Sequence, residues 1–275
     1  MKQRGKKLLY LTIITLVVTV SALGCAGLFQ HRLIFFPDRL DKDEDLSWTG
    51  ASEEVFVTTE DGARIHGLFF EAPRKSRGVV LYFHGNAGSV ASWYQVALRL
   101  NHHDVDVFLV DYRTYGKSRG DLSEQGLYFD GEATYQYLID RGYAPEEIVV
   151  HGRSLGGAVA TWVTKKYPVG GLILETPFTD LPSLARDLYR IGLPQRLFRF
   201  RFDNLSRASD IDAPTWVVHG TEDGIVPLEH GRQVYEELPE AWKFTVIDGG
   251  GHNDLMSFEE YSRDLISFYD LVLAP

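Results

Sequence analysis

Three patterns meet in the segment Ile148-Val149-Val150-His151-Gly152-Arg153-Ser154-Leu155-Gly156-Gly157-Ala158. A β-branched apolar run ends in Gly-x-Ser-x-Gly, and a run of small residues follows it directly. This order predicts a buried strand, a sharp turn and a helix, with Ser154 lifted out of the sheet at the turn. A Gly-x-Ser-x-Gly pentapeptide can occur by chance in any chain of this length. Its place between a strand and a helix makes Ser154 the candidate nucleophile.

Apolar runs and helical patterns alternate along the rest of the chain. Buried strands are predicted at residues 78–83, 105–110, 147–150, 172–174, 215–218 and 244–247, with helices at 92–100 and 127–139. Two further segments, 54–59 and 64–71, alternate with period two around a glycine turn and predict an antiparallel hairpin. Strands that alternate with helices imply right-handed crossovers. We therefore expect an α/β fold with a mostly parallel, eight-stranded sheet covered by helices on both faces.

The composition is that of one globular domain. The 275 residues are 44% hydrophobic and carry a formal net charge of −10. Outside the N-terminus the basic residues form no block, so nucleic-acid binding has little support. The single cysteine excludes an internal disulfide framework and thiolate metal clusters. Residues 85–88 lack the Lys-Ser/Thr end of a phosphate loop, so we expect no nucleotide, and we assign no other cofactor.

The N-terminus has the pattern of a segment that meets a membrane. Four basic residues precede an uncharged run over residues 8–29, close to the ~20 residues that a helix needs to cross a bilayer. Two interpretations stay open: a retained anchor, or a lipoprotein signal in which Cys25 becomes the lipid-bearing first residue. Simple secretion is a third. The basic residues favour a cytoplasmic N-terminus, which would place the catalytic domain on the non-cytoplasmic side.

The chain divides into three expected parts. Residues 1–29 are the anchor or lipoprotein signal, 30–50 a juxtamembrane connector, and 51–275 the main domain. Within the domain, residues 181–209 form an insertion rich in arginine and aromatic residues. A small helical lid over the site is one interpretation of this insertion, and an ordinary surface helix is the other.

A serine hydroxyl needs a general base, and that base needs a group that orients it. Asp223 lies just past the strand at 215–218, and His252 lies in a glycine-rich loop after the last strand. The order Ser154, Asp223, His252 is the order in which this kind of fold presents its triad. Glu175, at another strand end, is the rival for the acid. We favour Asp223 because the loop of Glu175 continues into Pro177 and precedes the insertion.

Charge that develops on a substrate carbonyl oxygen needs fixed donors, typically worth ~3 to 4 kcal/mol each. The sharp strand-to-helix turn at Ser154 is called the nucleophile elbow below. The backbone N–H of Leu155, at the start of the helix after this elbow, is one candidate. The amide of Asn86, in the loop after the strand at 78–83, is the other. His84, His151 and His219 each stand beside a glycine at a strand end. We interpret them as structural histidines and expect no metal site, because no two of them have the spacing of ligands.

Further motifs extend the pattern: Leu33-Ile34-Phe35-Phe36-Pro37, His84-Gly85-Asn86-Ala87-Gly88, Asp111-Tyr112-Arg113-Thr114-Tyr115-Gly116-Lys117-Ser118, Val226-Pro227 after Asp223, and Gly251-His252-Asn253-Asp254. With the elbow, they resemble the membrane-tethered α/β-hydrolase-domain family, which includes protein depalmitoylases and lysophospholipases, and more distantly the serine aminopeptidases. The resemblance covers roughly residues 30–275. Thr114 departs from the usual glycine, away from the triad.

The resemblance implies the α/β-hydrolase fold and serine-hydrolase chemistry on esters or thioesters. With the N-terminal segment, it favours a membrane-associated enzyme that acts on acylated or lipid-like substrates, or on small molecules of that kind. A serine peptidase is the alternative within the enzymes. A non-catalytic binding protein on a hydrolase scaffold is the alternative from another class.

Overall fold

The computed structural model describes residues 30–190 and 194–274. The expected membrane segment, with its uncharged run and Cys25, lies outside the described residues. Within them, no helix is both long enough and apolar enough to cross a membrane.

The centre of the fold is an eight-stranded sheet in the order β10-β9-β8-β7-β4-β6-β3-β2. Its strands are β2 (Glu53–Thr58), β3 (Arg64–Phe70), β4 (Val79–Phe83), β6 (Asp106–Val110), β7 (Ile148–Arg153), β8 (Gly171–Glu175), β9 (Thr215–Gly220) and β10 (Ala241–Ile247). The pairs β2–β3 and β3–β6 are antiparallel, and all other pairs of this sheet are parallel. The predicted mostly parallel, eight-stranded α/β sheet is confirmed, and so is its edge hairpin.

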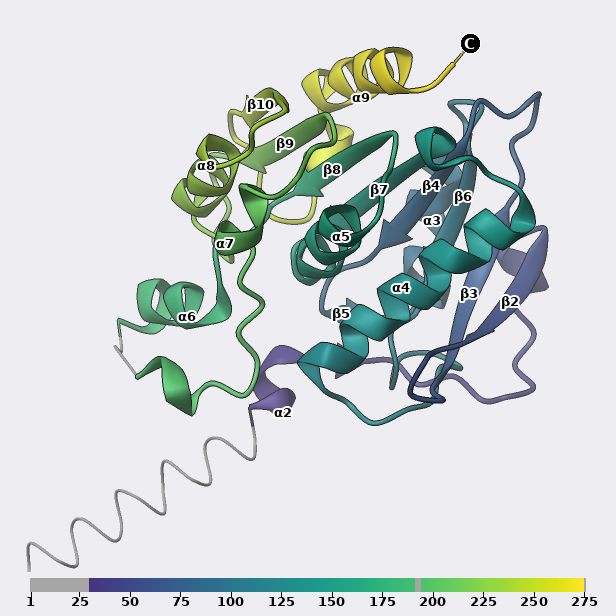
Figure 1. Cartoon of the computed structure of the whole chain (residues 1–275), viewed down its shortest axis with the longest axis horizontal. Helices are drawn as coiled ribbons and strands as arrows, with labels where there is room; N and C mark the ends of the chain where they lie inside the picture. The colour runs from purple at the N-terminus through teal and green to yellow at the C-terminus, as the bar shows by residue number, and fades with distance from the viewer. Residues whose placement is uncertain (1–29, 191–193, 275) are drawn as a thin grey trace, which may run out of the picture.

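Helices cover both faces of the sheet, and Figure 1 shows two of the long ones, α4 and α5, crossing in front of it. The longer helices are α3 (Val90–Asn101), α4 (Glu124–Arg141), α5 (Leu155–Lys166), α8 (Leu228–Glu236) and α9 (Glu259–Val272). Successive residues of a strand point to opposite faces. Accordingly Val150 belongs to one buried hydrophobic cluster and its neighbour Val149 to the other. The central strands are buried on both sides, which is why they read as continuous apolar runs.

The expected insertion, residues 181–209, forms α6 (Leu181–Tyr189), the 3-10 turn η3 (Gln195–Leu197) and α7 (Leu205–Ala208). Asp180 caps the N-terminus of α6, where its side chain accepts a 2.8 Å hydrogen bond from the N–H of Ser183. In Figure 1, α6 lies below and to the left of the sheet.

Residues 30–50 pack against the rest of the domain. They contain α2 (His31–Ile34), β1 (Phe36–Pro37) and the 3-10 turn η1 (Ser47–Thr49). β1 pairs in parallel with β5 (Ala87–Gly88), and the ring of Phe35 lies 4.9 Å from the ring of Phe200 in the insertion. The segment expected as a connector is therefore built into the domain. Two further 3-10 turns, η2 (Pro145–Glu147) and η4 (Leu255–Ser257), complete the described elements.

Candidate active site

Ser154 stands at the turn between β7 and α5, as its sequence pattern predicts. Its backbone angles are φ 52° and ψ −114°, a strained conformation for a residue with a side chain. The N–H of Ser154 donates a 2.9 Å hydrogen bond to the carbonyl of Glu175, which holds the turn against the neighbouring strand. A Cβ on Gly156 would collide with the carbonyl of Phe83, and a Cβ on Gly152 would collide with that of Gly156. The two glycines thus let the helix start directly against the sheet.

Asp223 and His252 lie in direct contact, with 2.7 Å between Asp223 Oδ2 and His252 Nδ1. The Asp223 side chain is fully buried, and its Oδ1 accepts 2.8 Å hydrogen bonds from the N–H groups of Ile225 and Val226. Burial acts to raise the pKa of Asp223, but hydrogen bonds from His219 and His252 outweigh it and hold the pKa well below its usual range. An ionised Asp223 requires a proton on His252 Nδ1. Nε2 of the neutral ring is then the basic nitrogen.

Arg153, the residue before Ser154, ties the nucleophile strand to the loop of His252. Its Nη2 donates to the main-chain oxygen of His252 at 2.7 Å and to Oδ1 of Asn253 at 2.8 Å. Its Nε lies 3.4 Å from Oε1 of Glu175. Sequence reasoning missed this contact, because the two residues are 99 positions apart and no local pattern pairs them.

Glu175, the rival acid, is occupied elsewhere. Besides its ion pair with Arg153, Oε2 accepts a 3.1 Å hydrogen bond from the hydroxyl of Tyr261 and lies 3.4 Å from Nε2 of His151. Its side chain is fully buried. Burial acts to raise the pKa of Glu175, but Arg153 and His151 lower it below its ordinary value. Of the two candidate acids, Asp223 is the one that contacts His252.

Leu155 and Asn86 line the same pocket as Ser154. Leu155 is the first residue of α5, so its N–H has no acceptor within the helix, and the positive end of the helix dipole lies there. The carbonyl of Asn86 accepts from the N–H of Phe36 at 2.9 Å and from the hydroxyl of Tyr115 at 2.7 Å. The Asn86 side chain donates a 2.8 Å bond to the carbonyl of Ile34. These bonds fix the Asn86 loop beside the elbow.

The Ser154 pocket has a volume of about 720 Å³. Apolar side chains make up most of its wall, among them Ile34, Phe178, Leu181, Leu184, Phe198 and Val226. They come from the N-terminal segment, from the loop after β8, from the insertion and from the Asp223 loop. No lining residue is acidic or basic. The arrangement can bring an extended apolar group to a serine hydroxyl. Sequence reasoning did not assign the N-terminal wall, because a two-residue strand such as β1 has no periodic signal.

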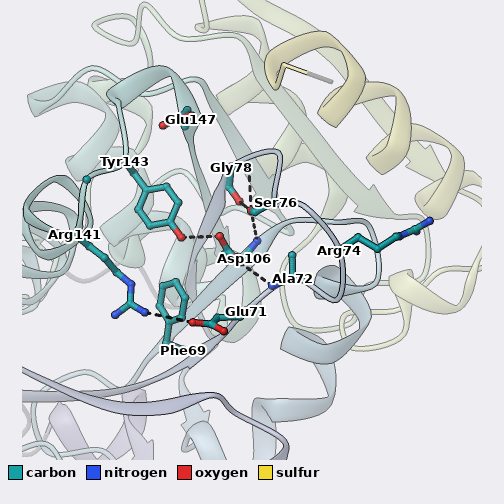
Figure 2. A pocket seen from close by; sticks show the side chains of 11 residues that line it. Phe69, Glu71, Ala72, Arg74, Ser76, Gly78, Asp106, Arg141, Tyr143 and Glu147 are labelled. Carbon is teal, nitrogen blue, oxygen red and sulfur yellow. Dashed lines mark hydrogen bonds and ion pairs between the residues drawn. The ribbon is translucent and has the colours of Figure 1, made fainter.

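A second pocket, of about 460 Å³, lies at the opposite end of the sheet, where β4 and β6 begin (Figure 2). Several of its polar groups are paired with one another. The hydroxyl of Tyr143 donates to Oδ2 of Asp106 at 2.6 Å, and the N–H of Ala72 donates to Oδ1 of Asp106 at 2.7 Å. Nη2 of Arg141 lies 4.0 Å from Oε1 of Glu71. The lining includes no histidine, cysteine or triad residue, so these contacts fasten surface loops.

Two of the three strand-end histidines, His84 and His219, are held by main-chain carbonyl oxygens. Nε2 of His219 lies 2.8 Å from the carbonyl of Val226, and Nδ1 of His84 lies 2.7 Å from the carbonyl of Gly85. His151 faces Glu175. In the part of the chain that the structure describes, no three or more His, Cys, Asp or Glu side chains are grouped to hold a metal ion.

Comparison with known proteins places the chain in a family. Residues 74–202 match the family model described as serine aminopeptidase, S33. An uncharacterised protein of Mycobacterium tuberculosis is 34% identical over 248 residues, which span 86% of this chain and 88% of that protein. Mouse α/β hydrolase domain-containing protein 17C is 32% identical over 226 residues, 79% of this chain and 68% of the relative. The chain belongs to the α/β-hydrolase-domain family.

A solved structure agrees with this assignment at the level of fold. The Pyrococcus furiosus esterase Pf2001 superposes with a TM-score of 0.70 over 88% of this chain and 99% of the esterase, at 22% sequence identity. The resemblance to the α/β-hydrolase-domain family and the α/β-hydrolase fold expected from the sequence are both confirmed, whereas the membrane tether stays a prediction. Membership of this family supports hydrolase activity.

Proposed function

We propose that this α/β hydrolase is a serine hydrolase that cleaves carboxylic ester or thioester bonds of acylated or lipid-like substrates. The observation that carries the proposal is the apolar pocket of about 720 Å³ that contains Ser154. Such a wall favours binding of a long acyl chain, because burying apolar surface away from water stabilises the complex by about 25 cal/mol per Å². The carbonyl at the end of that chain would then lie at the elbow.

The proposed reaction uses the residues in named roles. Ser154 Oγ attacks the substrate carbonyl while His252 Nε2 takes the hydroxyl proton, and Asp223 stabilises the resulting imidazolium. The N–H groups of Leu155 and Asn86 stabilise the oxyanion. The alcohol or thiol then leaves with the proton from His252, and an acyl-enzyme remains. Water, deprotonated by His252, attacks the acyl-enzyme, releases the carboxylic acid and restores Ser154.

The peptidase alternative finds less support in the pocket. An aminopeptidase has to bind the charged amino terminus of a peptide, and a carboxylate is the usual partner of an ammonium group. The lining of the Ser154 pocket includes no aspartate or glutamate. A non-catalytic binding protein would have no need for an ionised Asp223 in contact with His252.

The test is a substrate screen with the full chain. We expect hydrolysis of acyl esters and acyl thioesters, with a preference for longer chains, and little release from aminoacyl amides. A fluorophosphonate probe should label Ser154 and fail to label Ser154→Ala. Preference for aminoacyl amides would favour the peptidase, and absence of both labelling and turnover would favour the binding protein.

We also propose that residues 1–29 attach the chain to a membrane, with the hydrolase domain on the non-cytoplasmic side. The support is the sequence pattern of four basic residues before the uncharged run. Cys25→Ser separates the two forms of attachment. It blocks processing and acylation of a lipoprotein and leaves a larger species, whereas a retained anchor is indifferent to it. A freely soluble, unprocessed full chain would contradict both forms.

A further inference from the structure

We propose that the mouth of the Ser154 pocket is a docking face that seats on the surface of an anionic lipid bilayer. The face consists of five exposed apolar side chains, Leu33, Phe36, Leu188, Tyr189 and Ile225, which we call the apolar rim, and of the arginines interleaved with it. Seating would open the pocket directly to acyl chains in the bilayer. Only this last consequence rests on the proposed function.

The apolar rim is unusual for a protein surface. Leu33 is 75% exposed, Tyr189 69% and Phe36 51%. Of the ten large hydrophobic residues that are exposed in the described part of the chain, five line this one pocket. Single exposed apolar residues need no explanation, but a cluster around a pocket marks an interaction site.

Three distant segments build the apolar rim. Leu33 and Phe36 come from α2 and β1, Leu188 and Tyr189 from the end of α6, and Ile225 from the loop after β9. Figure 1 shows α2 and α6 together at the lower left, and α9 at the top, well away from them. The fold therefore gathers these side chains at one end of the molecule.

Arginines stand beside the apolar rim. The segment 186–201 includes five arginines and one acidic residue, Asp187, although the whole chain carries a net charge of −10. Arg186 and Arg190 flank the Leu188-Tyr189 pair, and Arg199 follows Phe198 in the pocket wall. Apolar side chains beside arginines suit the boundary between acyl chains and anionic headgroups.

The path of the chain supports a lipid occupant. The uncharged run over residues 8–29 ends directly before Gln30, and Gln30 itself lines the pocket. The Gln30 side chain donates to the carbonyl of Leu197 at 2.6 Å and accepts from the N–H of Arg199 at 2.8 Å. The point at which the chain enters the domain is thus fastened to the arginine segment. A membrane-bound residue 29 would keep the mouth at the bilayer surface.

A second copy of the chain fits this face less well. In a two-fold dimer the same patch meets itself, so the arginines around one apolar rim would face those of the other. Like charges in such an arrangement oppose association. An anionic bilayer instead complements them.

The test places a fluorophore on the full chain in vesicles. Cys25→Ser leaves a chain without cysteine, into which Leu188→Cys introduces one site for an environment-sensitive label. Ile266→Cys, on α9 and 44% exposed, is the matched control. We expect the label at 188 to be quenched by doxyl-labelled lipid and shielded from aqueous iodide, and the label at 266 to show the reverse. In chain recovered with the vesicles after reconstitution, equal behaviour of the two labels would overturn the proposal.

A charge test uses residues outside the pocket lining. Arg190→Gln with Arg196→Gln should weaken docking at position 188 roughly thirtyfold in vesicles that contain phosphatidylglycerol, read as the higher lipid concentration needed for the same quenching, as expected for two charges near an anionic surface. The matched pair Arg74→Gln with Arg263→Gln, on distant exposed sites, should have no such effect. If both pairs act alike, the arginines do not guide docking. A doubled mass by light scattering, with the 188 label shielded in the absence of lipid, would assign the face to a second copy instead.

Turnover of a soluble short-chain ester keeps the two proposals apart. Both arginine pairs should leave that turnover unchanged. If the chain docks but never cleaves the ester, the proposed function is contradicted and the docking proposal stands. If the chain cleaves the soluble ester but the two labels behave alike, only the docking proposal is contradicted.

Discussion

The guanidinium of Arg153 donates a 2.7 Å hydrogen bond to the main-chain oxygen of His252. Arg153 ends β7 and directly precedes Ser154, so the strand that positions the candidate nucleophile also holds the loop of the candidate base. The ion pair between Arg153 Nε and Glu175 also holds the guanidinium in place. Two loops that are remote in sequence thereby share one rigid support. In this role Arg153 is a positioning residue.

Arg153→Lys should lower kcat by roughly ten- to a hundredfold with little change in KM, because a misplaced base costs rate more than binding. Lysine offers a single ammonium and cannot span His252 and Glu175 as a planar guanidinium does. The matched control is Arg113→Lys, at a buried arginine that pairs with Asp130 and Asp61. The control should lower Tm but leave kcat per folded site unchanged. Steady-state kinetics at a temperature well below the Tm of both variants would measure this difference in kcat. A lowered Tm with unchanged kcat in Arg153→Lys would show that the role of Arg153 is structural.

Ser154→Ala should remove turnover by a factor of ~10⁴ to 10⁶ without unfolding the domain. The substitution keeps a Cβ in the strained turn and deletes only the hydroxyl, so the free energy of unfolding should change little. Kinetics and urea denaturation on the same purified sample check both halves. Activity within tenfold of the unmodified chain would contradict the assignment of Ser154 as the nucleophile.

The sequence predicted what depends on local patterns. Ser154, Asp223 and His252 each follow a strand end, and parallel strands bring such ends to one edge of the sheet. The remaining features of the site are long-range contacts between side chains. Two examples are the hydrogen bond from Arg153 to His252 and the position of Phe36 in the pocket lining. Both contacts form only once the chain is folded. No periodicity encodes them.

Asp223→Asn should lower kcat by about 10⁴, because an amide in place of the carboxylate favours the wrong tautomer of His252. Glu175→Gln should lower kcat far less, since Glu175 contacts Arg153 and Tyr261 and not His252. Its main effect should be on stability, because it leaves the buried charge of Arg153 without its partner. The measurement is kcat and Tm for both variants. The opposite ranking of the two kcat values would transfer the acid role to Glu175.

Glu175 should also contribute to the pH dependence of stability. Against the effect of burial, Arg153 and His151 lower its pKa. A carboxyl with a lowered folded pKa stabilises the fold fully above its unfolded pKa of about 4.3, and this stability is lost as pH falls through the folded value. The free energy of unfolding should therefore fall more steeply from about pH 5 downward in the unmodified chain than in Glu175→Gln. Urea titrations across that window measure both slopes, and parallel curves would show that Glu175 makes no such contribution.

Leu184→Trp should shorten the acyl chain that the enzyme accepts. Leu184 is 9% exposed and lines the Ser154 pocket from α6, so a larger ring there takes space that the distal methylenes of a substrate would occupy. Each excluded methylene costs about 1 to 3 kcal/mol of transition-state binding. We expect kcat/KM for long-chain esters to fall by tenfold or more while that for short-chain esters is retained. Leu271→Trp, on α9 and 54% exposed, is the control and should leave the chain-length profile unchanged. A uniform loss across all chain lengths in Leu184→Trp would mean that the substitution disturbs the triad, and an unchanged profile would mean that acyl chains do not enter along α6.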